Sequence, residues 1–232
     1  MQELGCHRMH DYLAILDTNP AIKNDAEQLL TVSISRFFRD RRLWKTLKDT
    51  IIPHVISQYG ETVQVWSAGC ALGQEAYSFT ILWLILGDTL GHLPQIHVWA
   101  TDSNPDYLNK AREGMYVRSA LKEMPETIIE NYLCPSEDKT TYSIIDTAQQ
   151  GIQWEIYNLI KEPTPMREFQ IIFLRNNLLT YYRQEIKEPA FRKVLKSLAH
   201  GGFLIIGSHE KLPCETTELV PFEGLSYIFR KI

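Results

Sequence analysis

The residues with the clearest chemistry lie between positions 69 and 75, where a turn holds two glycines, a cysteine and the carboxylate of Glu75. An apolar run at 63–68 precedes this turn, and a longer run suited to a helix follows it. A strand, a glycine turn and a helix in succession bring backbone N–H groups up against a cofactor in α/β domains. A second apolar run, 96–101, ends directly on Asp102, whose carboxylate could accept hydrogen bonds from ribose hydroxyls. The two segments predict a site for a cofactor that carries a nucleoside.

A third polar group follows a later predicted strand. Arg175 and Asn176 come directly after the apolar run 169–174. Because the carboxyl ends of parallel strands meet at one edge of a sheet, we expect the glycine turn at Gly69, Asp102 and the Arg175-Asn176 pair to converge. Each is an ordinary loop residue when taken alone, but three such ends at one edge favour a bound ligand.

The remaining pattern describes the elements that position these residues. Strands that alternate with helices predict an α/β fold with a mostly parallel sheet. Residues 134–156 depart from this alternation, and we expect them to form a small antiparallel insertion. Helices are expected at 43–59, 74–86, 106–113, 120–132 and 184–199, and the last strands at 203–207 and 226–230. We divide the chain into a short N-terminal helical region with a linker helix, 1–60, and a cofactor-binding domain, 61–232.

Size and composition limit the class of protein. A chain of 232 residues with 44% hydrophobic and 22% charged residues is typical of one soluble domain with a substantial core. The net charge of -4 offers no basic face for nucleic acid, so Phe37 and Phe38 are expected in the core or at a pocket lid rather than stacked on bases. The first residues lack the pattern of a signal peptide, and the longest apolar run, 79–86, is too short to span a bilayer. We therefore expect a cytoplasmic protein without membrane insertion.

Cysteine and histidine residues raise alternatives. The four cysteines are scattered, as is usual for reduced thiols. Cys70 lies in the glycine turn and could be a nucleophile, but no histidine accompanies it in a recognisable arrangement. Cys6, His7 and His10 could hold a metal, but no second ligand pair completes the group, and no metal site is predicted. The turn also lacks the Gly-x-Gly-x-x-Gly spacing of nicotinamide-dependent oxidoreductases.

Seven stretches, in order along the chain, resemble the CheR-type family, the chemoreceptor glutamate methyltransferases of bacterial chemotaxis. They are residues 33–40, 65–78, 100–102, 110–116, 157–159, 173–176 and 201–210. The resemblance implies the Rossmann-like fold of class I methyltransferases, with S-adenosylmethionine bound at the strand ends and S-adenosylhomocysteine as product. It also implies methyl esterification of glutamate side chains in an acidic protein substrate, a cytoplasmic helix of a chemoreceptor.

The resemblance further implies residue roles. Glu75 would bind the amino-acid end of the cofactor, and Asp102 would hold the ribose hydroxyls. No metal is required, because the methyl donor is already electrophilic and an ionised carboxylate needs no general base. The implied catalytic residues are Arg39, Arg175 and Tyr181. The implied cofactor-binding residues are Ser33, Ser35, Arg39, Gly69, Glu75, Asp102, Asn158, Leu159, Arg175 and Asn176.

The chain departs from the family pattern in several places, among them Leu72, Gln74 and Ala76 in the glycine turn. Ser33 and Ser35 stand where the family has Asn and Thr, and Thr180 stands where it has a Tyr close to the methyl group. Tyr181 is next along, and a shift of one residue would bring its hydroxyl near. The leading helical region is also shorter than usual. These departures leave open an alternative, a catalytically weak module of the same fold that binds S-adenosylmethionine or S-adenosylhomocysteine and signals to a partner.

Overall fold

The computed structural model describes residues 15, 18, 19, 36–165 and 167–232. Its contacts divide the chain into two compact units, residues 1–34 and 35–232. In the first unit, the backbone N–H of Asn19 donates a hydrogen bond to the carbonyl of Ile15 at 2.9 Å. The predicted cofactor ligands Ser33 and Ser35 lie outside the described residues, as does the group Cys6, His7 and His10.

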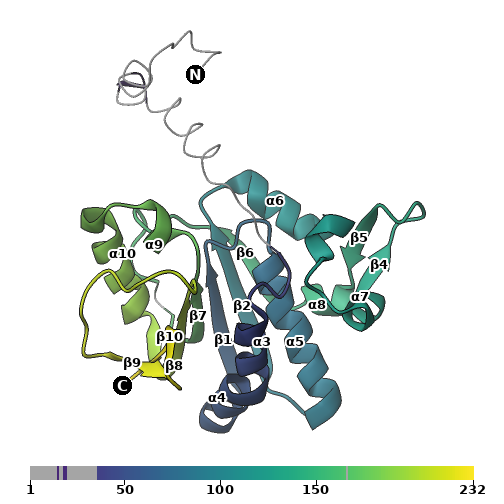
Figure 1. The fold of residues 1–232 in the computed structure, drawn as a ribbon, viewed down its shortest axis with the longest axis horizontal. Coiled ribbons are helices and arrows are strands. Elements are labelled where there is room, and N and C mark those ends of the chain that lie inside the picture. The colour runs from purple at the N-terminus through teal and green to yellow at the C-terminus, as the bar shows by residue number, and fades with distance from the viewer. Residues whose placement is uncertain (1–14, 16–17, 20–35, 166) are drawn as a thin grey trace. The chain divides into compact units, whose positions relative to one another are not determined.

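A seven-stranded sheet forms the centre of the second unit (Figure 1). Its strands, in spatial order, are β6 (Ile152–Ile156), β2 (Gln95–Asp102), β1 (Thr62–Ala68), β7 (Phe169–Leu174), β8 (Leu198–Ile206), β10 (Leu225–Lys231) and β9 (Leu219–Phe222). The first five are parallel, and β10 runs antiparallel to both β8 and β9. This arrangement confirms the mostly parallel α/β sheet. The strand order reverses between β1 and β7, and open α/β sheets bind ligands at such a switch point.

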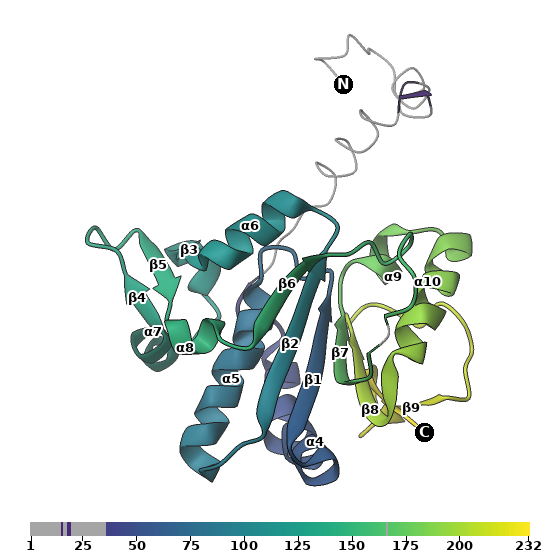
Figure 2. The ribbon, with the colours of Figure 1, turned by 180° about the vertical axis from the view of Figure 1, so that it is seen from behind.

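Helices cover both faces of this sheet (Figures 1 and 2). One apolar cluster joins α3, α4 and α5 to one face, and a second joins α10 to the other. Alternate residues of β8 enter different clusters: Phe203 belongs to the first and Leu204 to the second. This period of two is that of a strand buried on both faces. The helices are α3 (Arg41–Thr46), the π-helix η2 (Leu47–Ile51), α4 (Ile52–Tyr59), α5 (Gln74–Leu90), α6 (Pro105–Glu113), the 3₁₀-helix η3 (Arg118–Leu121), α7 (Glu126–Tyr132), α8 (Asp146–Gln149), α9 (Leu178–Tyr181) and α10 (Gln184–Lys196).

The predicted helix over 43–59 is a continuous run made of α3, η2 and α4. Pro53 lacks a backbone N–H, and its ring crowds the carbonyl of Asp49 four residues earlier, so we attribute the wider π-turn at this point to the proline. Gly60 ends the run with φ 70°. Leu43 and Val55 are fully buried in the cluster against the sheet. The sequence-based division at residue 60 therefore does not coincide with the division of contacts after residue 34.

The antiparallel insertion is real, but its extent was predicted wrongly. A second sheet, of order β3-β5-β4, consists of β3 (Met115–Val117), β5 (Thr141–Ile144) and β4 (Leu133–Pro135). Residues 152–156, which were assigned to this insertion, instead form β6 and pair in parallel with β2. Because β6 lies at an edge of the main sheet, its side chains are only half-buried or exposed. Such a pattern does not distinguish an edge strand from a strand of the insertion.

The end of the last long helix also differs from the sequence prediction. The sequence predicts a helix that runs to residue 199, just before Gly201 and Gly202, but α10 ends at Lys196, and both glycines lie within β8. Gly202 is packed against backbone: a Cβ there would come within 2.9 Å of the Ala199 carbonyl oxygen and 3.0 Å of that of Gln170. Gly202 therefore serves close strand packing, not helix termination.

In the part of the chain that the structure describes, no helix combines the length and apolar character needed to cross a membrane.

Candidate active site

Three strand ends meet at one edge of the sheet, as the sequence predicted. Ala68, the last residue of β1, pairs with Thr101 of β2, and Ser67 pairs with Phe173 of β7. Asp102, which ends β2, pairs with Ile156, which ends β6. The loops that leave these four strands are therefore neighbours, along the edge that carries α6 in Figure 1.

The glycine turn is tied to the end of β2. The backbone N–H groups of Gly69 and Cys70 both donate to the carbonyl of Thr101, each at 2.8 Å. Gly69 has φ 81°, in the left-handed region that favours glycine. A Cβ at this position would overlap the side chain of Asn177, whose amide donates to the carbonyl of Ala68. Position 69 therefore admits only glycine without a local rearrangement.

Asp102 lies beside this turn and is largely enclosed. Its Oδ2 accepts a hydrogen bond from the backbone N–H of Ala71, and its Oδ1 accepts one from that of Asn104, both at 2.9 Å. Burial raises the pKa of the Asp102 carboxyl above its ordinary value, and these backbone hydrogen bonds oppose the rise. Each carboxylate oxygen keeps a second lone pair, so the group can accept further donors from a ligand.

The next loop brings Asn158 and Leu159 near Asp102. The backbone N–H of Tyr157 donates to the carbonyl of Asp102 at 3.0 Å. The side-chain oxygen of Asn158 accepts from the backbone N–H of Ile160 at 2.9 Å, which shapes the loop. Leu159 packs against the second apolar cluster. Asn158 and Leu159, both predicted to bind the cofactor, thus lie directly after β6, on the side of Asp102 away from β1.

Arg175 is the most enclosed charged group of the site, with 4% of its side chain exposed. Its Nη1 donates to Oε2 of Glu75 at 3.0 Å, and its Nη2 donates to Oδ2 of Asp40. Glu75 also accepts a hydrogen bond from Ser67 Oγ at 2.8 Å. The Nε of Arg175 is buried and has no hydrogen-bond partner among the described residues. One guanidinium between two carboxylates leaves a net charge of about -1, and these two hydrogen bonds do not use the N–H donor at Nε.

Sequence reasoning did not assign Asp40 to the site. Asp40 precedes α3 and has φ 68°. The neighbouring aromatic residues are in the core, as predicted: Phe37 is fully buried, and the backbone N–H of Phe38 donates to Ser78 Oγ at 2.9 Å. The half-buried Arg39 lies between this anchor and Asp40, and its carbonyl accepts from Trp44 Nε1 at 2.8 Å. The cluster at 37–40 was the signal that could have identified Asp40, because the buried Phe37 and Phe38 fix the position of the charged residues that follow them.

Asn176 and the helix after it are joined to Glu210. The backbone N–H of Asn176 donates to Oε2 of Glu210 at 3.0 Å, and Thr180 Oγ1 donates to Oε1 at 2.5 Å. The hydroxyl at position 180 is therefore directed to Glu210. Tyr181 lies on α9 with 52% of its surface exposed.

Cys70 does not have the properties of a nucleophile. It is buried, and burial together with the charges of Asp102 and Glu75 raises the pKa of its thiol well above the ordinary value. A neutral thiol is a poor nucleophile. Over residues 36–165 and 167–232, no cluster of three His, Cys, Asp or Glu residues could hold a metal ion.

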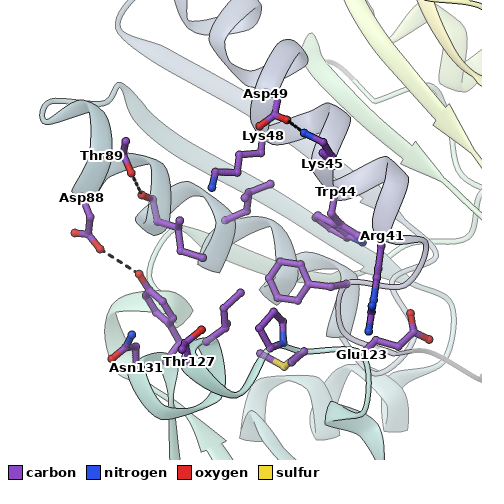
Figure 3. A pocket seen from close by; sticks show the side chains of 17 residues that line it. Arg41, Trp44, Lys45, Lys48, Asp49, Asp88, Thr89, Glu123, Thr127 and Asn131 are labelled. Atoms are coloured by element: carbon purple, nitrogen blue, oxygen red, sulfur yellow. Dashed lines mark hydrogen bonds and ion pairs between the residues drawn. The ribbon is translucent and has the colours of Figure 1, made fainter.

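A cavity of about 920 Å³ lies away from these strand ends (Figure 3). Basic residues Arg41, Lys45 and Lys48 come from α3 and η2, whereas Asp88 and Asn131 come from α5 and α7. None of the predicted site residues that the structure describes, which leaves out Ser33 and Ser35, lines this cavity. The predicted cofactor site and this cavity are therefore distinct.

The strand order, the glycine turn and the acid at the end of β2 define a class I methyltransferase with a Rossmann-like fold. Residues 33–228 match the family described as CheR methyltransferase, SAM binding domain. The chain belongs to this family, and its cofactor is S-adenosylmethionine.

Two relatives with the name chemotaxis protein methyltransferase agree with this assignment. The chain is 31% identical to a chemotaxis protein methyltransferase of Listeria innocua, over 79% of this chain and 67% of the relative. It is 28% identical to that of Listeria monocytogenes, over 87% and 74%. A third relative, an uncharacterized 104.1 kDa protein of Rhodobacter capsulatus, is 28% identical over 91% of this chain, which spans 22% of that protein. Among solved structures, a TehB-like SAM-dependent methyltransferase from Corynebacterium glutamicum has a TM-score of 0.43 at 13% identity, covering 91% of this chain and 97% of its own.

Proposed function

We propose that this protein transfers a methyl group from S-adenosylmethionine to glutamate side chains of an acidic protein substrate, a cytoplasmic helix of a chemoreceptor or a related signalling protein. The observation that carries the proposal is Arg175, buried between Glu75 and Asp40 with its Nε unpartnered among the described residues. A buried guanidinium donor suits a carboxylate. Two relatives named as chemotaxis protein methyltransferases support the choice of substrate.

The residues present fit the cofactor. Asp102 would accept hydrogen bonds from the ribose hydroxyls, since both of its oxygens keep a free lone pair beside the two backbone donors. The carboxylate of Glu75 would attract the ammonium group of the amino-acid end, and Asn158 with Leu159 would border the adenine. Gly69 would let the backbone approach the cofactor closely.

Catalysis would depend on alignment and exclusion of water. The cofactor supplies an electrophilic methyl group, and an ionised glutamate attacks without a general base. Arg39 and Arg175 would orient that glutamate. Very strong hydrogen bonds to its oxygens would reduce their nucleophilicity. Because Arg175 is already paired with two carboxylates, its hydrogen bonds to the glutamate would be weaker. A role for Tyr181 stays a prediction that requires movement of its exposed side chain.

The test is methyl transfer from cofactor labelled in its methyl group to a chemoreceptor cytoplasmic fragment. The expected product is a methyl ester, which releases volatile labelled methanol in alkali. The matched control is the same fragment with its candidate glutamates changed to glutamine. Equal labelling of both fragments would contradict glutamate as the acceptor. S-adenosylhomocysteine binding without transfer would favour the alternative, a signalling module that only binds the cofactor.

A further inference from the structure

We propose that Glu210 is a positioning residue: its carboxylate, oriented by the Thr180 hydroxyl, holds the turn at 175–177 and thereby places the Arg175 guanidinium. The proposal rests on the methyl transfer proposed above. Glu210 does not belong to the predicted set of site residues, but its side-chain carboxylate contacts the backbone N–H of the predicted residue Asn176. Its position is nevertheless central, since it joins the end of β7 to the end of β8.

The carboxylate of Glu210 connects two strand ends. Its Oε2 accepts hydrogen bonds from the backbone N–H of Asn176, at 3.0 Å, and from that of Gly207, at 2.6 Å. The backbone N–H of Glu210 donates to the carbonyl of Gly207 at 2.9 Å, which closes a tight turn. A Cβ at Gly207 would lie 2.7 Å from Oε2 of Glu210 and 2.8 Å from Oδ1 of Asn176. Glycine at 207 is therefore what lets the carboxylate reach the end of β7.

The turn that Glu210 holds is conformationally unfavourable. Asn176 has φ 55°, in the left-handed region that asparagine tolerates and most residues avoid. Its two neighbours reach in different directions: Arg175 reaches Glu75 and Asp40, and the side-chain amide of Asn177 donates to the carbonyl of Ala68. The hydrogen bond from the backbone N–H of Asn176 to Glu210 fixes the middle residue of the turn 175–177. Without it, a polar N–H would lose its partner and the turn would relax.

Thr180 completes the arrangement from α9. Its hydroxyl donates to Oε1, the oxygen of Glu210 that does not accept from Asn176 or Gly207. This contact orients the carboxylate so that Oε2 faces both backbone donors. It also gives a role to Thr180, which stands where the family has a Tyr. The Thr180 hydroxyl orients Glu210, and Glu210 holds the turn that carries Arg175.

The test compares S-adenosylhomocysteine binding, measured by calorimetry, in variants of the full chain. Glu210→Ala should weaken binding about tenfold or more, whereas Glu210→Gln, which can still accept from the two backbone donors, should stay within about threefold of the wild type. Thr180→Val should weaken binding several-fold, and Thr180→Ser should restore it. Circular dichroism establishes that each variant is folded at the temperature of titration. If Glu210→Ala does not fold, the Thr180 pair decides.

A double-mutant cycle separates positioning from mere stabilisation. Arg175 is one of the predicted cofactor-binding residues, so Arg175→Met should lower the affinity by itself, and Glu210→Ala should add little to that loss if Glu210 acts through Arg175. Additive losses would overturn the proposal, as would folded Glu210→Ala protein with wild-type affinity and only a lower Tm. Failure of the wild type to bind S-adenosylhomocysteine would instead contradict the cofactor site itself.

Discussion

At the scale of single residues, the site depends on charged groups that are largely enclosed by the protein. Asp102 is enclosed and holds two backbone N–H groups, whereas Arg175 is enclosed between two carboxylates. Breaking a buried ion pair from one side leaves an uncompensated charge. Changes to these residues should therefore alter ligand binding far more than similar changes at the surface.

The raised pKa of Asp102 predicts a pH dependence of S-adenosylhomocysteine binding. The ionised carboxylate is the form that accepts ribose hydroxyls, so affinity should fall as pH decreases through a value above the ordinary 3.8. Calorimetry across this range should show the decline in the wild type. Asp102→Asn should bind weakly with little pH dependence, and a parallel decline in both proteins would contradict the assignment. For stability the sign is reversed: the contribution of Asp102 is largest below pH 3.8 and is lost as pH rises through the folded-state pKa.

Arg39 is predicted to act in methyl transfer more than in cofactor binding. Arg39→Ala should lower the rate of transfer to the receptor fragment about 100-fold, the size expected for losing an orienting contact. Its S-adenosylhomocysteine affinity should change less than about fivefold. The measurements are initial rates and calorimetry on the same preparation. Equal losses in both would make Arg39 a binding residue only.

At the scale of elements, the turns that leave the strands decide the geometry. Gly69 needs both a left-handed backbone and the absence of a Cβ, since Asn177 occupies the space beside it. Asn176 needs a left-handed backbone and an acceptor for its N–H. The strands end at fixed positions in the sheet, and the turns at Gly69 and Asn176 set the direction of the side chains beside them.

The predicted effect of Gly69→Ala separates backbone strain from steric overlap. Gly224 is the matched control, because it has φ 71° but no atom lies within 4 Å of the position that a Cβ would take there. Gly224→Ala should lower the free energy of unfolding by about 1–2 kcal/mol through strain alone. Gly69→Ala should lower it by about 2–4 kcal/mol, because Asn177 must also give up its hydrogen bond. Urea unfolding measures both, and equal losses would mean that Asn177 moves away without cost.

At the scale of the whole molecule, cofactor binding should stabilise the fold. The site draws on loops after β1, β2, β6 and β7, so a ligand there joins strands from both sides of the switch point. The 920 Å³ cavity between α3, η2, α5 and α7 is lined by none of the predicted site residues that lie within 36–165 and 167–232. Occupancy of the two places can therefore be distinguished by mutation.

A thermal-shift measurement tests this distinction. At 100 times its Kd, S-adenosylhomocysteine should add about 2.7 kcal/mol to the free energy of unfolding and raise Tm by about 5–10 °C. Lys48→Ala, in the separate cavity, should show the same shift, whereas Asp102→Asn should show little. A shift abolished by Lys48→Ala but kept by Asp102→Asn would move the cofactor to the cavity.

Much of the fold follows from local patterns in the sequence. Apolar runs of strand length, the glycines at 60, 69 and 114, and the Asn104-Pro105 start of α6 each act within a few residues. The convergence of Gly69, Asp102 and Arg175 also followed, because parallel strands bring their carboxyl ends to one edge regardless of exact register.

Only the tertiary structure decided the contacts between distant segments. Asp40 meets Arg175 across 135 positions and Glu210 meets Asn176 across 34, and neither pairing has a periodic signal in the sequence. The placement of β6 in the main sheet was equally hidden, since an edge strand shows the same half-buried pattern in either sheet. Local patterns determine which element forms and which side chain ends it. Which side chains then meet depends on strand register and on how helices pack, and both are set by the free energy of the whole core.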